Sequence, residues 1–337
     1  MIERLLSSKS YGERMASIWM DLARYGDSHG YQDDTERIMW PWRDWVIHAY
    51  NKNLPYDEFI TWQIAGDMIP NATKEQILAS GFNRNHKITQ EGGVIPEEYR
   101  VEYVADRAVT TSKVMMGLTV ECARCHTHKY DPITHKEFFS FYSFFNNVQE
   151  DGIIKYGDLA PKPNFTIKKE DIQNELSFVN LPDSISKVTL MVMKESEKLR
   201  KTYVLNRGSY DSPTDLVEPG TPKVVLPFDD SKYPKNRVGL AKWFFEDDNP
   251  LTSRVAVNRI WQQFFGIGIV STPDDFGSQG SKPTNPELLD WMAYTYQNTD
   301  KWNTKKFIKR IVMSSTYTQS SKIKSENLAI DPDNTCL

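Results

Sequence analysis

The sequence is poor in cysteine, in net charge and in long apolar runs, and each shortage excludes a class of protein. Three cysteines are too few for a disulfide-rich scaffold. No apolar run reaches the roughly 18 residues that a transmembrane helix needs, so no membrane span is encoded. The 41 Lys+Arg residues against 45 Asp+Glu residues give a formal net charge of −4. This balance argues against a nucleic-acid partner, and against a membrane-surface protein, that depends on bulk positive charge.

The start of the chain also lacks a signal peptide. Residues 1–6 have no basic n-region, and neither a long apolar stretch nor a small-residue cleavage site follows. Taken alone, this start indicates a cytoplasmic protein. Helical periodicity nevertheless begins with the first residues, and the chain stops after Cys336 without a terminal element, so we expect both ends to be cut. Cys336 has no visible partner and is expected to be a bystander.

The sequence is rich in aromatic residues and in helical periodicity. Its 9 Trp, 16 Tyr and 16 Phe supply large buried surfaces, and 337 residues suffice for two ordinary domains. Residues 1–150 are predicted to be mostly helical, with Thr73 capping a short helix and Gly117 ending the helix that starts at Pro96. The aromatic run 138–145 is predicted to be a core helix.

The rest of the chain changes character twice. Residues 151–235 contain many prolines between short β-like runs such as 188–193 and 202–205, so we expect a β-containing connector without a core of its own. Residues 236–337 are predicted to form a second helical domain, truncated at its end. Two of its helices are expected to start at Asn249-Pro250 and at Asn285-Pro286. A third is expected to be capped by Thr304. The fold class is therefore mainly α with a small β-containing connector.

A short cluster of cysteine and histidine is the strongest motif in the sequence. Cys122-Ala123-Arg124-Cys125-His126 has the C-x-x-C-H pattern of covalent c-type haem attachment. Two thiols three residues apart on a helical turn face the same way, so each can bond one haem vinyl group. The histidine next to the second thiol then supplies the proximal iron ligand. The sequence therefore predicts haem c bound through Cys122, Cys125 and His126.

Two other interpretations of this cluster stay open. Cys122, Cys125, His126 and His128 together could hold zinc or another divalent metal ion, although His126 and His128 would crowd a tetrahedral site. The two cysteines could instead be structural thiols or a redox-active disulfide.

The sequence does not fix the sixth ligand of the haem iron. His128 is too close to His126 to reach the opposite face of the same iron. His86 is a distal candidate because it stands in a polar loop, where an ordinary hydrogen-bonded histidine is the alternative. A five-coordinate iron also stays open. The other candidates are His135, Met115 and Met116.

A carboxylate-rich segment, residues 91–107, is a second candidate site. Glu98 with Glu102, and Glu102 with Asp106, are one helical turn apart, so like charges share a face unless cations intervene. Paired carboxylates support hydrolysis when the pKa of one acid is raised by its neighbour. A solvated helix face with salt bridges is the alternative. The candidate catalytic residues are Glu91, Glu97, Glu98 and Asp106.

Longer stretches around these motifs resemble two known families. Residues 117–133, which contain the C-x-x-C-H motif, look like the hallmark of the planctomycete cytochrome-associated family, domain of unknown function 1549. Upstream stretches that match it as well are residues 11–14, 21–25, 43–46, 91–93 and 106–111. Residues 254–261, 264–266, 274–277 and 286–291 resemble its usual partner, domain of unknown function 1553. The two resemblances cover nearly the whole chain.

The resemblance implies an exported protein that often carries a separate cytochrome-c-like domain before the first match. It implies little about the reaction, because the function of both families is unknown. Family members commonly have an acidic residue between the two histidines, where this chain has Thr127. A role for that acid in orienting His126 or binding a metal is therefore in doubt here.

These observations lead to one expectation and two alternatives. We expect a periplasmic or otherwise extracytoplasmic c-type haem protein with an electron-transfer or redox-support role, served by a redox partner protein or a fused cytochrome domain. The first alternative is an extracytoplasmic, polysaccharide-directed hydrolase that uses paired carboxylates. The second is a non-haem Cys/His metal-binding module. The residues leave open whether the chain is an enzyme.

Overall fold

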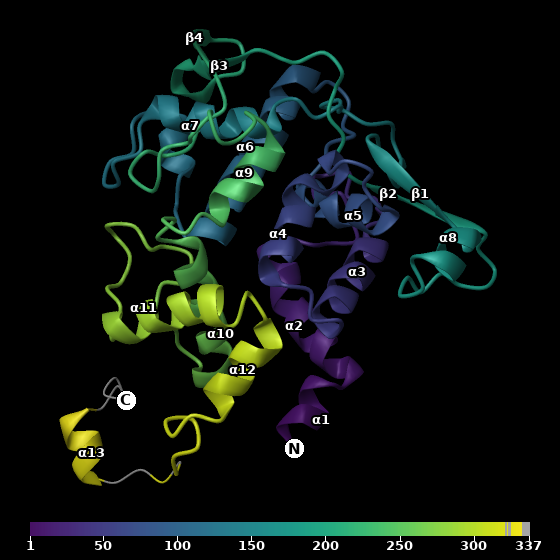
Figure 1. The fold of residues 1–337 in the computed structure, drawn as a ribbon. Coiled ribbons are helices and arrows are strands. Elements are labelled where there is room, and N and C mark those ends of the chain that lie inside the picture. The colour runs from purple at the N-terminus through teal and green to yellow at the C-terminus, as the bar shows by residue number, and fades with distance from the viewer. Residues whose placement is uncertain (321, 323–324, 332–337) are drawn as a thin grey trace.

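Helices predominate over strands in the structure, a computed structural model that describes residues 1–320, 322 and 325–331 (Figure 1). The mainly helical fold expected from the sequence is confirmed. The helices of residues 1–150 are α1 (Ile2–Leu6), α2 (Lys9–Leu22), α3 (Trp40–Asn51), α4 (Tyr56–Ala65), α5 (Lys74–Ala79), α6 (Pro96–Met116) and α7 (His135–Tyr142). Short 3₁₀ turns among them are η1 (Gly66–Met68), η2 (Ser80–Arg84), η3 (Glu121–Arg124) and η4 (Ser143–Phe145).

Local sequence signals set the ends of several of these helices. The Thr73 hydroxyl accepts the Gln76 N–H while the Gln76 side chain accepts the Thr73 N–H, which is a capping box at the start of α5. Pro96 occupies the first turn of α6, where its missing N–H costs nothing. Gly117 ends α6 with φ 62°, a left-handed conformation that favours glycine. These boundaries agree with the sequence-based expectation.

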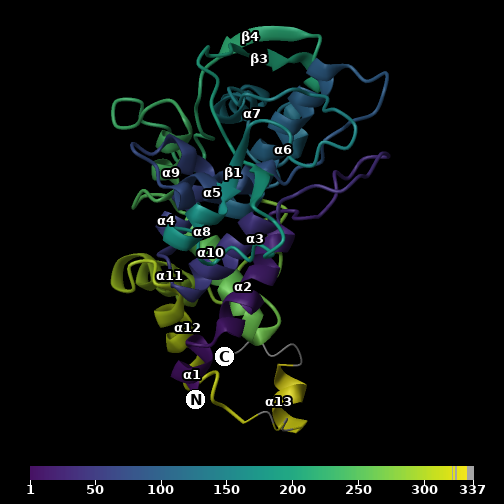
Figure 2. The same cartoon turned by 90° about the vertical axis from the view of Figure 1, so that its right-hand side faces the viewer.

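The connector is built from two small antiparallel pairs. The strand β1 (Asn164–Lys168) pairs with β2 (Lys187–Met191), and β3 (Thr202–Leu205) pairs with β4 (Pro213–Val217). Between β1 and β2 lies the short helix α8 (Lys169–Asn174). The β3–β4 pair packs on α7 at one end of the molecule (Figures 1 and 2). The turn η5 (Asn206–Gly208) follows β3 directly.

The C-terminal part is again helical. Its described elements are α9 (Arg237–Phe244), α10 (Thr252–Phe265), α11 (Pro286–Tyr294) with a π-helical turn at Thr295–Thr299, α12 (Thr304–Val312) and α13 (Ser325–Ile330). The helix expected from Asn249 begins two residues after Pro250, and the Asn249 side chain accepts the N–H groups of Leu251 and Thr252 at its start. The expected Thr304 cap is wrong, since Asn303 accepts the Lys306 N–H. Cys336 lies outside the described residues.

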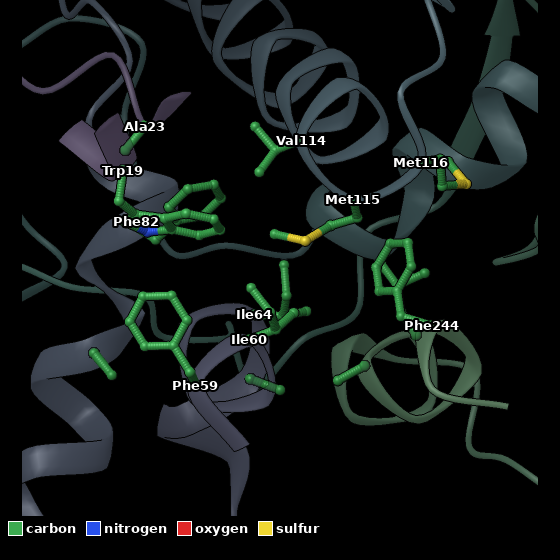
Figure 3. Packing of buried hydrophobic residues seen from close by; sticks show 14 of the residues in the cluster. Trp19, Ala23, Phe59, Ile60, Ile64, Phe82, Val114, Met115, Met116 and Phe244 are labelled. Atoms are coloured by element: carbon green, nitrogen blue, oxygen red, sulfur yellow. The ribbon is translucent and has the colours of Figure 1, made fainter. Parts of the chain in front are cut away.

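One hydrophobic core runs through all three parts of the chain. Figure 3 shows Trp19, Phe59 and Phe82 gathered on one side, with Met115 projecting from the end of α6 toward Ile64. The Trp19 ring lies 5.0 Å from that of Phe59 and 5.8 Å from that of Phe82, between ring centroids. The cluster also includes residues of β2 and of α9. Because its members come from distant parts of the sequence, the core holds the elements that carry the sequence motifs in one rigid frame.

The C-terminal part binds directly to the segment that contains the C-x-x-C-H motif. The Phe276 N–H donates to the Gly117 carbonyl at 2.7 Å, before the motif, and the Ser278 N–H donates to Asp131 Oδ1 at 2.7 Å, after it. A side chain at Gly277 would collide with the Asp131 carboxylate, so glycine permits this close approach. We call residues 276–278, which form these two hydrogen bonds, the clasp.

Within the ranges that the structure describes, no helix is both long and apolar enough to cross a membrane.

Candidate functional site

The two motif cysteines lie on a single exposed turn. Cys122 and Cys125 are both unpaired and exposed. Cys122 belongs to η3, and the Cys125 N–H donates to the Cys122 carbonyl at 3.3 Å. Side chains three residues apart on a 3₁₀ turn eclipse one another. The thiols are therefore presented toward the same side, as the spacing predicts.

Contacts with the rest of the fold hold this turn in place. Ala123 is fully buried, and the Arg124 guanidinium forms a two-pronged ion pair with Glu102 on α6, with Nη1 to Oε2 at 2.7 Å. His135 Nε2 donates to the Arg124 carbonyl at 2.9 Å. Bidentate arginine–carboxylate pairs fix orientation as well as distance. The exposed thiols consequently stand on a turn whose backbone is held in place.

The turn of the connector also touches the motif. Gly208, with φ 75°, lies so close to Cys125 that a Cβ there would stand 3.3 Å from Cys125 Sγ and 3.2 Å from Arg124 Cγ. A larger residue at this position would therefore press on the second thiol and on its anchor.

His126 is exposed and carries its proton on the ring nitrogen nearer the backbone. Its Nδ1 lies 2.7 Å from the Thr127 carbonyl oxygen. A carbonyl accepts and does not donate, so Nδ1 bears the hydrogen and, in the neutral imidazole, Nε2 has a free lone pair. Histidines that bind metals commonly donate their other N–H in this way. The backbone carbonyl of Thr127 therefore orients the His126 ring.

His86, the distal candidate, has no free ring nitrogen. Its Nδ1 donates to the Lys87 carbonyl at 2.8 Å, and its Nε2 accepts from Arg107 at 2.6 Å. The side chain is buried against the Tyr103 ring. Burial, with Arg107 and Arg84 nearby, lowers the pKa of His86 well below its usual value, so it stays neutral. In this fold, the sequence-based assignment of His86 as an iron ligand is not supported, because ligation would break the bond to Arg107.

His128 is occupied as well. Its Nδ1 accepts the Asp131 N–H at 2.8 Å, which leaves the proton on Nε2. Among the residues that the structure describes, no three His, Cys, Asp or Glu side chains are placed to hold a metal ion. The alternative zinc site of Cys122, Cys125, His126 and His128 is therefore not preformed.

The four candidate catalytic carboxylates take different partners and do not form a pair. Glu97 binds Arg100 at 2.7 Å, and Glu98 is exposed. Glu91 accepts the Gln32 N–H at 2.7 Å and so tethers the α2–α3 loop. Asp106 forms an ion pair with Arg24 at 2.6 Å. The Arg100 guanidinium lowers the pKa of Glu97, which is the opposite of what a general acid needs.

Sequence reasoning overlooked a polar cleft that joins the two candidate segments. The cleft has a volume of about 450 Å³ and lies along α6, where its lining includes Glu102, Asp106, Arg24, Glu121 and Arg124. Glu102 and Asp106 are one turn apart, and each is neutralised by an arginine from elsewhere in the chain. Because Glu121 and Arg124 line the cleft together with residues of α6, the cleft lies between α6 and the C-x-x-C-H turn. Arg24 gives no periodic signal in the sequence, and its positive φ of 56° is visible in the structure alone.

Comparisons with known proteins identify two family segments. Residues 1–150 match the family PSCyt2, protein of unknown function (DUF1549), and residues 236–337 match PSD1, protein of unknown function (DUF1553). The two families and their order agree with the resemblance found in the sequence. No curated protein matches the chain, and no solved structure does.

Proposed function

We propose that this chain, in which a DUF1549 segment precedes a DUF1553 segment, is an extracytoplasmic c-type haem-binding protein with an electron-transfer or redox-support role. Cys122 and Cys125 would hold the haem through thioether bonds, and His126 would be the proximal ligand of its iron. A redox partner protein or a fused cytochrome domain would exchange electrons with it.

The observation that carries the proposal is the state of His126. The side chain is exposed, follows the second thiol directly and donates Nδ1–H to the Thr127 carbonyl, which leaves Nε2 free. His86, His128 and His135 each use a ring nitrogen differently, in bonds to Arg107, Asp131 and Arg124. His126 therefore fits the ligand role best.

The residues around the motif fit a covalently attached group. Both thiols are free and exposed, so each S–H can add across a vinyl group without loss of other atoms. Arg124 and its Glu102 partner keep the turn from moving when a planar group is attached to it. When bound, the haem supplies one-electron chemistry.

A pyridine haemochrome spectrum of protein matured with a periplasmic haem-ligation system tests the proposal. We expect stoichiometric covalent haem in the wild type and in Cys336→Ser, which removes the chain's third cysteine as a matched control. Cys122→Ala with Cys125→Ala should abolish attachment. In the absorption spectrum of the native protein, recorded without pyridine, His126→Ala should keep covalent haem but change the Soret band, whereas His48→Gln, a matched histidine control, should not.

Two results would overturn the proposal. One is wild-type protein that carries no covalent haem after maturation. The other is elemental analysis that finds stoichiometric zinc and no iron, which would favour the metal-binding alternative. A substrate-panel assay with Glu98→Gln, compared with the wild type, tests the hydrolase alternative separately.

A further inference from the structure

A small hollow lies beside the loop between α2 and α3; it shares Arg24, Lys87 and Asp106 with the polar cleft, and none of the C-x-x-C-H residues lines it. Its volume is about 310 Å³, and its lining includes Arg24, Gly30, Arg37, Lys87 and Asp106. The loop projects from the helical body (Figure 2) but is tethered. The Ile88 N–H donates to the His29 carbonyl at 3.0 Å, in addition to the bonds that Glu91 accepts. The hollow is therefore a fixed part of the fold.

Among the residues that the structure describes, Arg37 is a buried cation in the lining that forms no ion pair with a carboxylate, although Asp27 and Asp34 lie close enough for their charges to act on it. Arg37 is 4% exposed, and its guanidinium donates to the carbonyls of residues 26, 85 and 86 at 2.8–3.1 Å. Those bonds use three of its five N–H donors. Burial, and then the charge of Arg24, lowers the pKa of Arg37 to about 10, so the group is still charged at neutral pH. A buried cation that binds neutral oxygens alone leaves a positive potential in the hollow.

A second cation, Lys87, borders both the hollow and the neighbouring cleft, and Gly30 leaves room for its stem. Gly30 has φ 90°, and a Cβ there would lie 2.7 Å from Lys87 Cγ. The missing side chain makes room for the Lys87 stem, whose ammonium sits 5.0 Å from the centre of the Tyr31 ring. In the described part of the chain Lys87 forms no ion pair with a carboxylate. The position of the Lys87 stem therefore depends on glycine at residue 30.

Arg24 is the third cation, and Asp106 is the single acid in the lining. Arg24 also has a positive φ, 56°, and donates to the Thr110 hydroxyl besides pairing with Asp106. The lining therefore carries three permanent positive charges against one negative charge. Four acids of the α2–α3 loop do not line the hollow, although Asp27 and Asp34 raise the pKa of Arg37 and Asp34 accepts the Gly30 N–H: Asp27, Asp33, Asp34 and Glu36. Asp34 and Glu36 are exposed, where solvent and salt screen them.

We propose that this hollow binds the oxyanion group of a small ligand, a phosphate, sulfate or carboxylate, through Arg24 and Lys87, with the buried charge of Arg37 behind them. An arginine fork matches the planar or tetrahedral arrangement of such oxygens, and a lysine ammonium adds a point charge. The excess of positive charge disfavours cationic ligands. The proposal does not depend on haem, because the motif residues take no part in it.

Isothermal titration calorimetry of the full chain with sodium phosphate, sodium sulfate and sodium acetate tests the proposal, with sodium chloride holding ionic strength constant. We expect saturable binding of at least one oxyanion. Lys87→Gln should weaken it about tenfold, the effect of losing one charge-assisted hydrogen bond. Lys235→Gln is the matched control, since Lys235 is exposed and paired with Glu218 and Asp230.

Arg24→Gln is a second variant and should weaken binding as well, with folding checked by circular dichroism. If Arg24→Gln does not fold, Lys87→Gln decides. Binding of acetate alone would identify a carboxylate ligand, and binding of phosphate or sulfate a tetrahedral one. The proposal is overturned if no oxyanion binds saturably at millimolar concentration, or if the folded variants bind as tightly as the wild type.

Discussion

Replacement of Glu150 by Gln is expected to destabilise the protein strongly, because Glu150 is the acid of a buried charge cluster. Its carboxylate accepts hydrogen bonds from Arg84 and Arg107, and the side chains of all three residues are at most 2% exposed. Burial alone would raise the pKa of Glu150, but the two guanidinium groups outweigh that effect and lower it. The cluster therefore contains two positive charges and one negative charge at neutral pH.

Glu150→Gln leaves both arginines buried without a counter-charge, and the amide N–H₂ then faces guanidinium donors. Removing one partner of a buried pair costs about 3–5 kcal/mol. A native domain is stable by about 5–15 kcal/mol, so the loss is a large fraction of the total. The matched control is Glu218→Gln, which breaks an exposed pair with Lys235 and should cost less than about 1 kcal/mol.

Urea denaturation followed by both tryptophan fluorescence and circular dichroism measures the difference. Coincident transitions are needed before a free energy of unfolding is assigned. We expect the midpoint of Glu150→Gln to fall with little change in the slope. A free energy of unfolding within about 1 kcal/mol of the wild type would refute the reasoning, because it would mean that the arginines do not need this carboxylate.

Three further predictions use the same denaturation assay. Because the pKa of His86 is lowered by burial and by Arg107, the unfolded chain binds a proton that the native state does not, so stability falls as pH drops below 6.5. His86→Gln should make that fall shallower by up to about 1.4 kcal/mol per pH unit, and an unchanged slope would contradict this. Gly152→Ala should lower the free energy of unfolding by about 3 kcal/mol or more, because its Cβ overlaps the Pro96 carbonyl. In the control Gly92→Ala the new Cβ meets no atom, so the change should stay within about 0.5 kcal/mol. Equal effects of the two substitutions would be inconsistent with the structure. Thr134→Ala removes a capping box from α7 and should cost about 1 kcal/mol, unless solvent satisfies the freed N–H groups.

The helical frame was predictable because its signals are local. Thr73 caps α5, Pro96 opens α6 and Gly117 closes it, each within a few residues of the boundary that it sets. That the two cysteines share one turn follows from their spacing in the same way, whereas their exposure does not. By contrast, β4 exposes four of its five residues, so the alternation that marks a half-buried strand is missing from its sequence.

The candidate site was harder to predict because its partners are distant in the sequence. Asp106 is paired by Arg24, and Glu102 by Arg124, and neither arginine lies on the same helix as its carboxylate. A helical wheel shows the two acids as neighbours with like charge, but it cannot show which cations the tertiary fold delivers. For the same reason the loop position of His86 did not reveal that Arg107 occupies its second nitrogen.

The clasp has a consequence for separating or exchanging the two family segments. Phe276 and Ser278 hold Gly117 and Asp131, which bracket the C-x-x-C-H turn from the other family segment. A DUF1549 segment expressed by itself would lose both hydrogen bonds, and the chain on either side of the cysteine turn would be held only by contacts within that segment. The two family segments therefore depend on each other for structure and are not interchangeable modules. A chimaera that exchanges one half has to exchange the complementary surface as well.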